Sequence, residues 1–375
     1  MSSEMTRKEF MQTLTGVAAA GAYLGFQSAY AASKPKLKLG VELYGYGGDY
    51  FAGSMSTEDC IADIADMGAE GISIIGESHV PNYPNPPDKW VEQWFGWMDQ
   101  YKTKPGAMVN FVDTLIYKGR YTTPEEGAEH FIRDCKLANK LGIKALRASW
   151  PPYPADDPKE ADLAPYAWSQ AAIQTIEKAL PAAEKYDVRI AVELHSPSDL
   201  NGTLVNRSLE YIEKTKTRYF GFCPDMSIFT KRLPRIQMNG LIKRGARENI
   251  MKFIDEAYQN KLGAAKTVAE VRRMGGNEIE LEFAGLGGAY HFSWNDPKDL
   301  AKILPYSYHF HAKFWEMTDD FKEYSIPYED VIPVILKTGY DWWYSSEYEG
   351  PRGLYEASKA NRKHHYMLRK LMEKA

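Results

Sequence analysis

Beyond residue 31, apolar and polar positions follow two alternating periodicities. The period-two pattern of strands occupies residues 38–46, 71–77, 106–115, 143–150, 188–195, 219–225, 306–314 and 342–347. Helical periodicity fills most of the intervals, for example at 58–67, 124–141, 166–185 and 328–337. Several helical stretches stop at a glycine suited to a C-terminal cap: Gly68, Gly142 and Gly339. Strands separated by helices predict parallel pairing, and eight such units predict a closed α/β barrel of the (β/α)8 type.

An open, doubly wound sheet is the alternative arrangement for this order of elements. That fold carries a glycine-rich phosphate turn after its first strand. The sequence has none there, and the stretch 285–288 lies elsewhere and lacks the spacing. About 75 residues, 231–305, separate the sixth and seventh strand runs, which is more than a regular unit needs. We therefore predict one TIM-barrel domain over residues 32–375, with 231–305 as an inserted helical and loop subregion.

The insertion has a pattern of its own. Residues 247–274 predict one or two helices, and the glycines at 275–276 and 285–288 predict turns. A basic cluster opens the segment: Lys231, Arg232, Arg235, Lys243, Arg244 and Arg247. A solvated face is the commonest role for such a cluster, and an active-site roof or a subunit contact are the alternatives.

The first 31 residues have the composition of an export signal. Arg7 and Lys8 precede a mildly apolar stretch at 14–26, and residues 29–31 offer small side chains for cleavage. The run 6–11 resembles the twin-arginine (Tat) motif, with Lys8 where the second arginine would stand. We expect a periplasmic or extracellular protein, with ordinary secretion or an uncleaved tail as alternatives.

Composition limits the remaining classes of partner. The chain has 375 residues and a net charge of −4, and no apolar run reaches the roughly 18 residues of a membrane span. Neither a membrane partner for the mature protein nor nucleic acid is expected. The three cysteines, Cys60, Cys135 and Cys223, are odd in number and far apart, so we expect buried thiols and no disulfide framework.

Alternation along the last four strands predicts which side chains enter the barrel. In the fifth strand the branched Val192 faces the helices, so Glu193 and His195 face inward. In the sixth, Phe222 faces outward and Asp225 follows on the inner side. In the seventh strand the inward side chains are His309, His311 and Lys313, and the outward ones are Tyr308, Phe310 and Ala312. In the eighth strand the inward side chains are Glu347 and Glu349, and the outward ones are Tyr344 and Tyr348. Chemistry in such barrels sits at the carboxyl ends of the strands, where these side chains converge.

Three carboxylates crowded together repel one another unless a cation lies between them. A divalent ion is the simplest resolution, and its predicted ligands are Glu193, Asp225, Glu347 and one inward histidine of the seventh strand. Oxygen ligands with one imidazole suit Mn²⁺ or Mg²⁺, and Co²⁺ or catalytic Zn²⁺ remain alternatives. Each glutamate taken alone would more often be a structural ion-pair partner.

Four motifs carry a family resemblance: Val-Glu-Leu-His195, Cys-Pro-Asp225, His-Phe-His-Ala-Lys313 and Ser-Ser-Glu-Tyr-Glu349. They resemble the fifth to eighth strands of the xylose-isomerase-like sugar isomerase and epimerase superfamily, and the resemblance spans about residues 36–350. It implies a single Mn²⁺-type ion held by the same three carboxylates and by His311, which is read from the His-x-Lys pattern, with His309 as the less favoured ligand. More narrowly, residues 40–46, residues 76–79 and His195 are similar to the catalytic subunits of C-glycoside deglycosidases. The insertion and the export signal depart from compact epimerases, so we expect either a homo-oligomer or a partner subunit.

The expected chemistry is proton abstraction next to a carbonyl group, with the metal stabilising the enolate. In epimerases of the superfamily two glutamates act as both ligand and acid/base, which makes Glu193 and Glu347 the candidates here. His195 is an alternative base, or a hydrogen-bond partner that orients a carboxylate.

Further residues are expected to contact substrate. Lys313 either neutralises the enolate oxygen or pairs with Glu349, and Arg147 either binds substrate or forms an ion pair with Glu42. The remaining substrate-binding candidates lie near the ends of the first, second and eighth strands: Tyr44, Glu77, His79 and Glu349. Aromatic residues gather after the second strand and suit either sugar stacking or a helical core stripe: Tyr83, Trp90, Trp94, Trp97 and Tyr101.

The leading interpretation is a metal-dependent isomerase or epimerase of a free or oxidised carbohydrate. A lyase that uses the same enolisation to cleave 3-keto glycosides is the second. A noncatalytic, exported sugar-binding protein is the alternative from another class. A metal-dependent apurinic endonuclease shares the barrel, but it needs additional histidines and a basic surface that this chain lacks.

Overall fold

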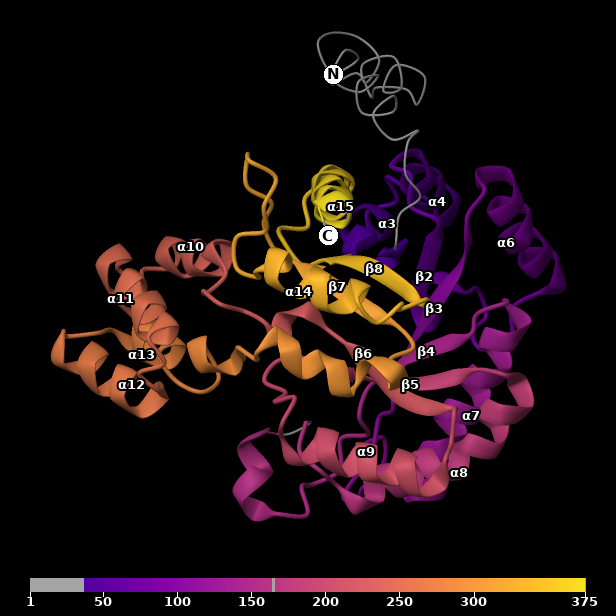
Figure 1. The fold of residues 1–375 in the computed structure, drawn as a ribbon, viewed down its shortest axis with the longest axis horizontal. Helices are drawn as coiled ribbons and strands as arrows, with labels where there is room; N and C mark the ends of the chain where they lie inside the picture. Colours follow the sequence, from indigo (N-terminus) through magenta and orange to yellow (C-terminus); the bar gives the residue numbers. More distant parts are fainter. Residues whose placement is uncertain (1–36, 164–165, 375) are drawn as a thin grey trace, which may run out of the picture. The chain divides into compact units, whose positions relative to one another are not determined.

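The computed structural model describes residues 37–163 and 166–374, and its core is an eight-stranded parallel barrel (Figure 1). The strands are β1 (Lys38–Glu42), β2 (Gly71–Ile75), β3 (Lys104–Asn110), β4 (Ala145–Ala148), β5 (Arg189–Leu194), β6 (Phe220–Pro224), β7 (Phe310–Phe314) and β8 (Trp343–Tyr348). They follow the order β6-β5-β4-β3-β2-β1-β8-β7. Two bridges, Phe222 to Ser307 and Asp225 to His311, connect β6 to the β7 segment, so the barrel is nearly closed. The predicted barrel is confirmed, and the predicted signal at 1–31 lies outside the described residues.

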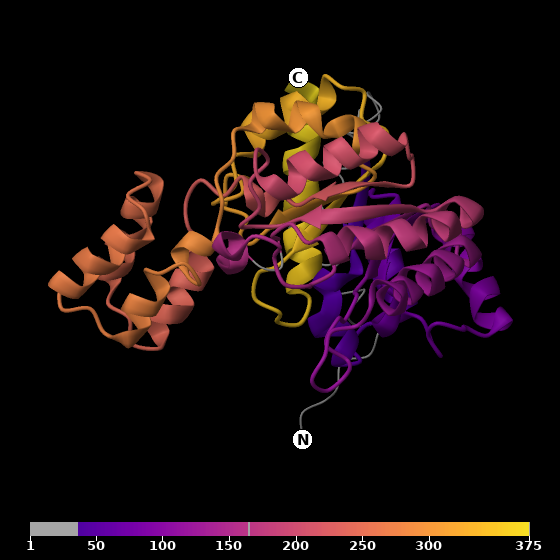
Figure 2. The same cartoon turned by 90° about the horizontal axis from the view of Figure 1, so that it is seen from below.

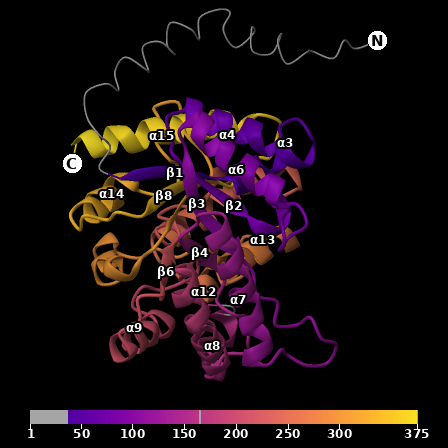
Figure 3. The same ribbon diagram turned by 90° about the vertical axis from the view of Figure 1, so that its right-hand side faces the viewer.

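Helices surround this barrel, as Figures 1 and 3 show from two sides. The longer ones are α4 (Thr57–Asp66), α6 (Asp88–Tyr101), α7 (Pro124–Lys140), α8 (Gln170–Tyr186), α9 (Thr203–Thr215), α14 (Tyr328–Leu336) and α15 (Glu356–Lys374). Capping boxes at Ser56 and Thr123 start α4 and α7. Gly68, Gly142 and Gly339 have positive φ angles just past helix ends, as their role as caps requires. Among the described helices, none is long and apolar enough to cross a membrane.

The first two strands are shorter than the sequence pattern predicts. Pairing of β1 ends at Glu42, and the chain continues as η1 (Leu43–Tyr46) and α3 (Gly47–Phe51). After Ile75 the chain enters α5 (Gly76–His79). Tyr44 and Glu77 therefore lie on short helices beyond the strand ends, where period-two alternation no longer fixes the direction of a side chain.

The segment between β6 and β7 holds a helical group that Figure 2 shows beside the barrel. The group consists of α10 (Arg235–Lys243), α11 (Glu248–Gln259), α12 (Ala264–Arg273) and α13 (Glu278–Phe283), and the rest of the segment contains η3 (Met226–Ile228), η4 (Ala289–His291), η5 (Pro297–Lys302) and η6 (Leu304–Tyr306). A separate apolar cluster supports the group: Leu233, Met238, Ala246, Ile250, Met251, Ile254, Tyr258, Val271, Phe283, Ala284 and Ala289. Arg247 pairs with the buried Glu280, and Arg235 pairs with Glu316, so part of the basic cluster serves internal ion pairs.

The seventh strand corrects one predicted orientation. Between the two bridges to β6, the chain advances four residues on the β7 side, from Ser307 to His311, against three on the β6 side. This extra residue is a bulge, and it shifts the alternation by one position. Tyr308 therefore packs inside the barrel with Ala191 and Cys223, so its predicted outward orientation is wrong.

Gly221 leaves the space that Tyr308 occupies. A Cβ at this position would overlap the carbonyl oxygen of Tyr306 and lie 2.7 Å from the Tyr308 ring. We expect Gly221→Ala to destabilise the protein by about 1–3 kcal/mol, the usual cost of overpacking a core. Thermal unfolding measures the effect. The matched control is Gly96→Ala on the exposed side of α6, where an added Cβ meets nothing within 4 Å, and it should unfold at or slightly above the wild-type temperature.

Candidate metal and substrate site

Four strands bring one potential metal ligand each to the carboxyl end of the barrel. Glu193 is on β5, Asp225 directly follows β6, His311 is on β7 and Glu347 is on β8. All four side chains are buried. One ligand atom from each lies within 4.8 Å of every other, so the structure brings together the four residues that the sequence singled out. We refer to them as the four-ligand cluster.

The ligand atoms approach one another at ion-pair distances. His311 Nδ1 lies 2.8 Å from Glu193 Oε1 and 3.1 Å from Glu347 Oε2. None of these three atoms, nor Asp225 Oδ2, has a hydrogen-bond partner within the described part of the chain. Buried polar atoms are rarely left in this state. Carboxylate and imidazole atoms that converge on a common point fit a divalent cation between them.

Two cations border the four-ligand cluster. Arg147 on β4 forms an ion pair with Glu193. Lys313 on β7 lies 3.2 Å from Asp225, 3.5 Å from Glu347 and 3.3 Å from Glu349, and it is almost fully buried. The predicted pairing of Lys313 with Glu349 is therefore present, and it is one of three such contacts.

These charges act differently on the two glutamates of the cluster. Burial opposes ionisation of Glu193, but the guanidinium of Arg147 and the imidazole of His311 outweigh it and hold the pKa well below its usual range. For Glu347 burial dominates over His311 and Lys313, and its pKa is raised.

The ion pair considered between Arg147 and Glu42 is absent. Arg147 is paired in register with Ala191 on β5, and from there its side chain reaches Glu193, two residues further on. Glu42 instead accepts a hydrogen bond from His309 Nε2 at 2.7 Å. Glu42, His309 and His311 also bring ligand atoms within 4.8 Å of one another. Since the glutamate and His309 already satisfy each other, this set fits a metal less well than the four-ligand cluster.

His195 lies just past β5 and is half-buried. Its Nδ1 lies 2.7 Å from the carbonyl oxygen of Ser196, and its ring stacks with Tyr166 at 6.0 Å between centroids. A carbonyl only accepts, so Nδ1 carries the hydrogen in this contact, and Nε2 is the ring nitrogen left for proton transfer. Since Nδ1 bonds to the backbone, this contact gives no support to the alternative that His195 orients a carboxylate.

Tyr44 and Glu349 lie near the edge of the four-ligand cluster. The Arg352 guanidinium covers the Tyr44 ring at 4.4 Å. Burial, followed by the carboxylate of Glu349, raises the pKa of the Tyr44 hydroxyl, which therefore remains a hydrogen-bond donor at neutral pH.

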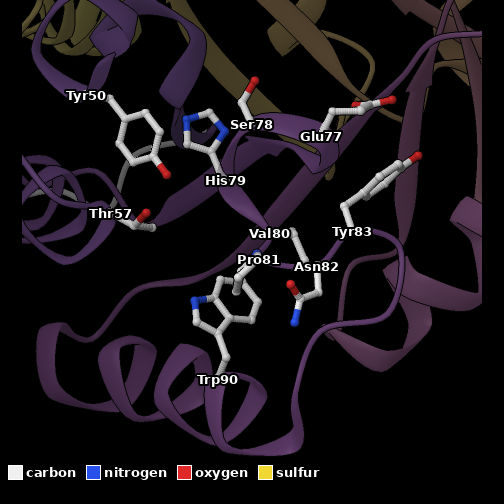
Figure 4. A pocket seen from close by; sticks show the side chains of 10 residues that line it. All are labelled: Tyr50, Thr57, Glu77, Ser78, His79, Val80, Pro81, Asn82, Tyr83 and Trp90. Carbon is white, nitrogen blue, oxygen red and sulfur yellow. The ribbon is translucent and has the colours of Figure 1, made fainter. Parts of the chain in front are cut away.

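Glu77 and His79 do not join the cluster. They line a separate cavity of about 570 Å³, which we call the side cavity (Figure 4). Its lining residues are Tyr50, Thr57, Glu77, Ser78, His79, Val80, Pro81, Asn82, Tyr83 and Trp90. Trp94 is completely buried, so the aromatic run after β2 is partly a core stripe and partly a cavity wall.

Three residues near the cluster were missed at the sequence level. Phe111, half exposed just after β3, lies under the guanidinium of Arg147 at 5.4 Å. Tyr166 and His291 both approach His195, with ring centroids 6.0 and 6.4 Å away. The inward position of Phe111 could have been found by continuing the alternation of the third strand past its end. Tyr166 and His291 lie in segments where no periodic pattern predicts the direction of a side chain.

Comparisons with known proteins place the chain in a family. Residues 61–371 match the family described as xylose isomerase-like TIM barrel. The 3'-dehydrocarminate deglycosidase alpha subunit of a Microbacterium species is 26% identical over 328 residues, which cover 84% of this chain and 88% of that protein. A C-glycoside deglycosidase alpha subunit of Arthrobacter globiformis is 24% identical over 350 residues, which cover 90% and 93%.

Solved structures show the same fold. An IolI protein with a bound zinc atom superposes with a TM-score of 0.53 at 13% identity, covering 90% of this chain and 99% of that one. A sugar phosphate isomerase/epimerase from Parabacteroides distasonis superposes with a TM-score of 0.53 at 10% identity, covering 90% and 96%. At these identities the likeness concerns the fold alone.

Proposed function

The chain belongs to the xylose isomerase-like TIM-barrel family, and we propose that it is a metal-dependent carbohydrate enzyme that removes a proton next to the carbonyl group of a keto sugar. The observation that carries this proposal is the convergence of four buried ligand atoms without hydrogen-bond partners. Three carboxylates and one imidazole suit Mn²⁺ best, with Mg²⁺, Co²⁺ and Zn²⁺ as alternatives. Bound there, the ion would act as a Lewis acid that stabilises negative charge on the carbonyl oxygen of the substrate.

The chain's own groups supply the proton transfer. In the first step a base accepts the proton from the carbon beside the carbonyl group, the C–H electron pair forms a carbon–carbon double bond, and the carbonyl oxygen becomes an enolate. Glu193, Glu347 and His195 are the candidate bases. The ammonium group of Lys313, held among carboxylates, adds a positive charge near the developing enolate.

Two outcomes can follow from the same enolate. Return of the proton to the opposite face or to the neighbouring carbon gives an epimer or an isomer. In a 3-keto glycoside the enolate can instead expel the group at the anomeric carbon, which leaves with the electron pair of the broken bond and takes up a proton. The curated relatives named deglycosidase alpha subunits support this second, lyase outcome.

A substrate panel decides between the outcomes. The purified protein is loaded with Mn²⁺ and incubated with free ketoses and with 3-keto O- and C-glycosides, and products are followed by chromatography and by exchange of substrate protons with deuterated water. We expect exchange at the carbon beside the carbonyl in at least one substrate class. A protein that binds these sugars but shows neither exchange nor product would instead be a sugar receptor.

His195 provides a prediction that separates a base from a ligand. We expect His195→Asn to lower kcat by about 100-fold or more, since general base catalysis contributes 10²–10⁴-fold, and to leave Mn²⁺ affinity unchanged. Isothermal calorimetry and steady-state kinetics measure the two quantities. A variant with wild-type kcat would assign proton abstraction to the glutamates alone.

We also propose a partner subunit and export. Exposed large apolar side chains occupy the segments that follow β1, β3, β4 and β8: Phe51, Phe111, Leu115, Ile116, Tyr117, Tyr121, Leu163 and Leu354. Apolar exposure of this kind marks interaction surfaces, and the relatives' designation as alpha subunits supports a second chain, with a homo-oligomer as the alternative. For export, the composition of residues 1–31 is the support.

A further inference from the structure

The side cavity is distinct from the four-ligand cluster in both position and chemistry. Its walls come from the segments that follow β1 and β2 and from the first turns of α4 and α6. The cluster is built from β5 to β8. Both lie at the carboxyl end of the barrel, because α4 and α6 begin where the loops from β1 and β2 end. A volume of about 570 Å³ is in the range of small-ligand sites.

We infer that the side cavity is a second carbohydrate-binding site, which holds one neutral sugar unit that does not react. The inference extends the proposed function to the recognition of a larger saccharide or glycoside, but the binding itself requires neither the metal nor the reaction. Aromatic faces and uncharged polar groups in one cavity are the combination that recognises the C–H faces and hydroxyl groups of a sugar.

The aromatic wall is fixed in place before any ligand binds. Trp90 is half-buried and lies over the buried Trp94, with ring centroids 6.0 Å apart and planes inclined by 17°. The Trp94 indole N–H donates to the carbonyl oxygen of Leu141 at 3.0 Å, which anchors the pair. The contact with Trp94 therefore fixes the position of Trp90, which lines the cavity. A rigid stacking surface loses little entropy on binding.

The opposite wall is held by hydrogen bonds. The Tyr83 hydroxyl donates to Asp134 at 2.6 Å, and the ring nitrogen Nδ1 of His79 lies 3.1 Å from the backbone of Ile75. Tyr50 packs against the His79 ring with centroids 4.9 Å apart. Figure 4 shows these rings around the cavity together with Glu77, Ser78 and Asn82, whose polar groups can pair with sugar hydroxyls.

The charge of the lining disfavours an anionic ligand. Among the described residues that line the side cavity, none is a lysine or an arginine. Burial lowers the pKa of His79 to about 4, so its ring is neutral at pH 7. With Glu77 as the lining carboxylate, a sugar phosphate would meet repulsion, and the neighbouring guanidinium of Arg133, which donates to the Tyr83 hydroxyl, is already paired with Asp134. A neutral hexose unit is consequently the ligand that this chemistry favours.

Binding of methyl β-D-glucopyranoside tests the inference. This glycoside has no carbonyl group, so it is not a substrate for enolisation. Saturation-transfer NMR and titration are carried out on the full chain, and we expect Trp90→Ala to weaken binding about tenfold or more. Asn82→Gly is the second variant, because Asn82 has a φ of +53° that glycine adopts freely, so the side chain is removed without backbone strain. Phe95→Ala, on the same helix but outside the cavity, is the matched control and should bind like the wild type.

Three results would overturn the inference. The first is that the wild-type chain does not bind the glycoside. The second is that Trp90→Ala and Asn82→Gly both bind it as well as the wild type does. The third is that Glu193→Gln loses binding while Trp90→Ala retains it. The last result would place the sugar at the four-ligand cluster, so it would refute the second site and leave the proposed function standing. Binding by Glu193→Gln with loss in Trp90→Ala supports the inference whether or not the enzyme proposal holds.

Discussion

Replacing Glu193 with glutamine is expected to lower turnover by at least about a thousandfold and to weaken Mn²⁺ binding by more than about 100-fold. The carboxylate is a candidate base, and such groups contribute 10²–10⁴-fold to rate. It also supplies one of the four ligand atoms, and even residues that only support metal ligands change affinity by 10–100-fold. Glutamine preserves the size of the side chain, so Glu193→Gln tests the charge. Steady-state kinetics and calorimetric titration with Mn²⁺ measure the two losses.

The matched control for this variant is Glu213→Gln on the exposed face of α9. It makes the same chemical change far from the carboxyl end of β5 and should behave like the wild type in both measurements. Because Arg147 pairs with Glu193, circular dichroism and thermal unfolding should accompany the kinetics. A folded Glu193→Gln protein with normal metal content and normal rate would refute the assignment of the site.

Removal of the metal is the second change expected to have a large effect. Dialysis against a chelator should abolish turnover and lower the unfolding temperature, because the carboxylates of Glu193, Asp225 and Glu347 then share a buried volume without the ion. Mn²⁺ at 100 times its Kd should restore about 2.7 kcal/mol of stability, which corresponds to several degrees for a protein of this size. Differential scanning calorimetry measures the shift.

The variant Asp225→Asn provides the control for this experiment. It removes a ligand charge from the four-ligand cluster, so it should show little or no Mn²⁺-dependent shift in unfolding temperature. An equal shift in the wild type and in Asp225→Asn would mean that Mn²⁺ stabilises the chain somewhere other than the proposed site.

The barrel and the four-ligand cluster were predictable because both depend on period-two alternation within strands. On β5 and β8 the strand remains regular up to Glu193 and Glu347, so their inward direction could be read from the chain. Asp225 and His311 also lie opposite each other as a bridge between neighbouring strands. The order of the elements then placed all four side chains at one end of the barrel.

Predictions were wrong or incomplete where backbone register or loops decide the geometry. The extra residue before β7 turns Tyr308 inward, and a bulge leaves no signal in the pattern of apolar positions. The partner of Arg147 depends on the stagger between β4 and β5, which one strand alone does not reveal. Glu77 and His79 lie on α5, past the end of β2, and strand alternation does not extend that far.

The central claim is that Glu193, Asp225, His311 and Glu347 bind one divalent cation together. Crystals of the Mn²⁺-loaded protein measured at the manganese absorption edge test it most directly. The account predicts a single strong anomalous peak within about 2.0–2.3 Å of a side-chain atom from each of the four residues. A peak coordinated by other residues, or no peak from protein that is catalytically active without metal, would contradict it.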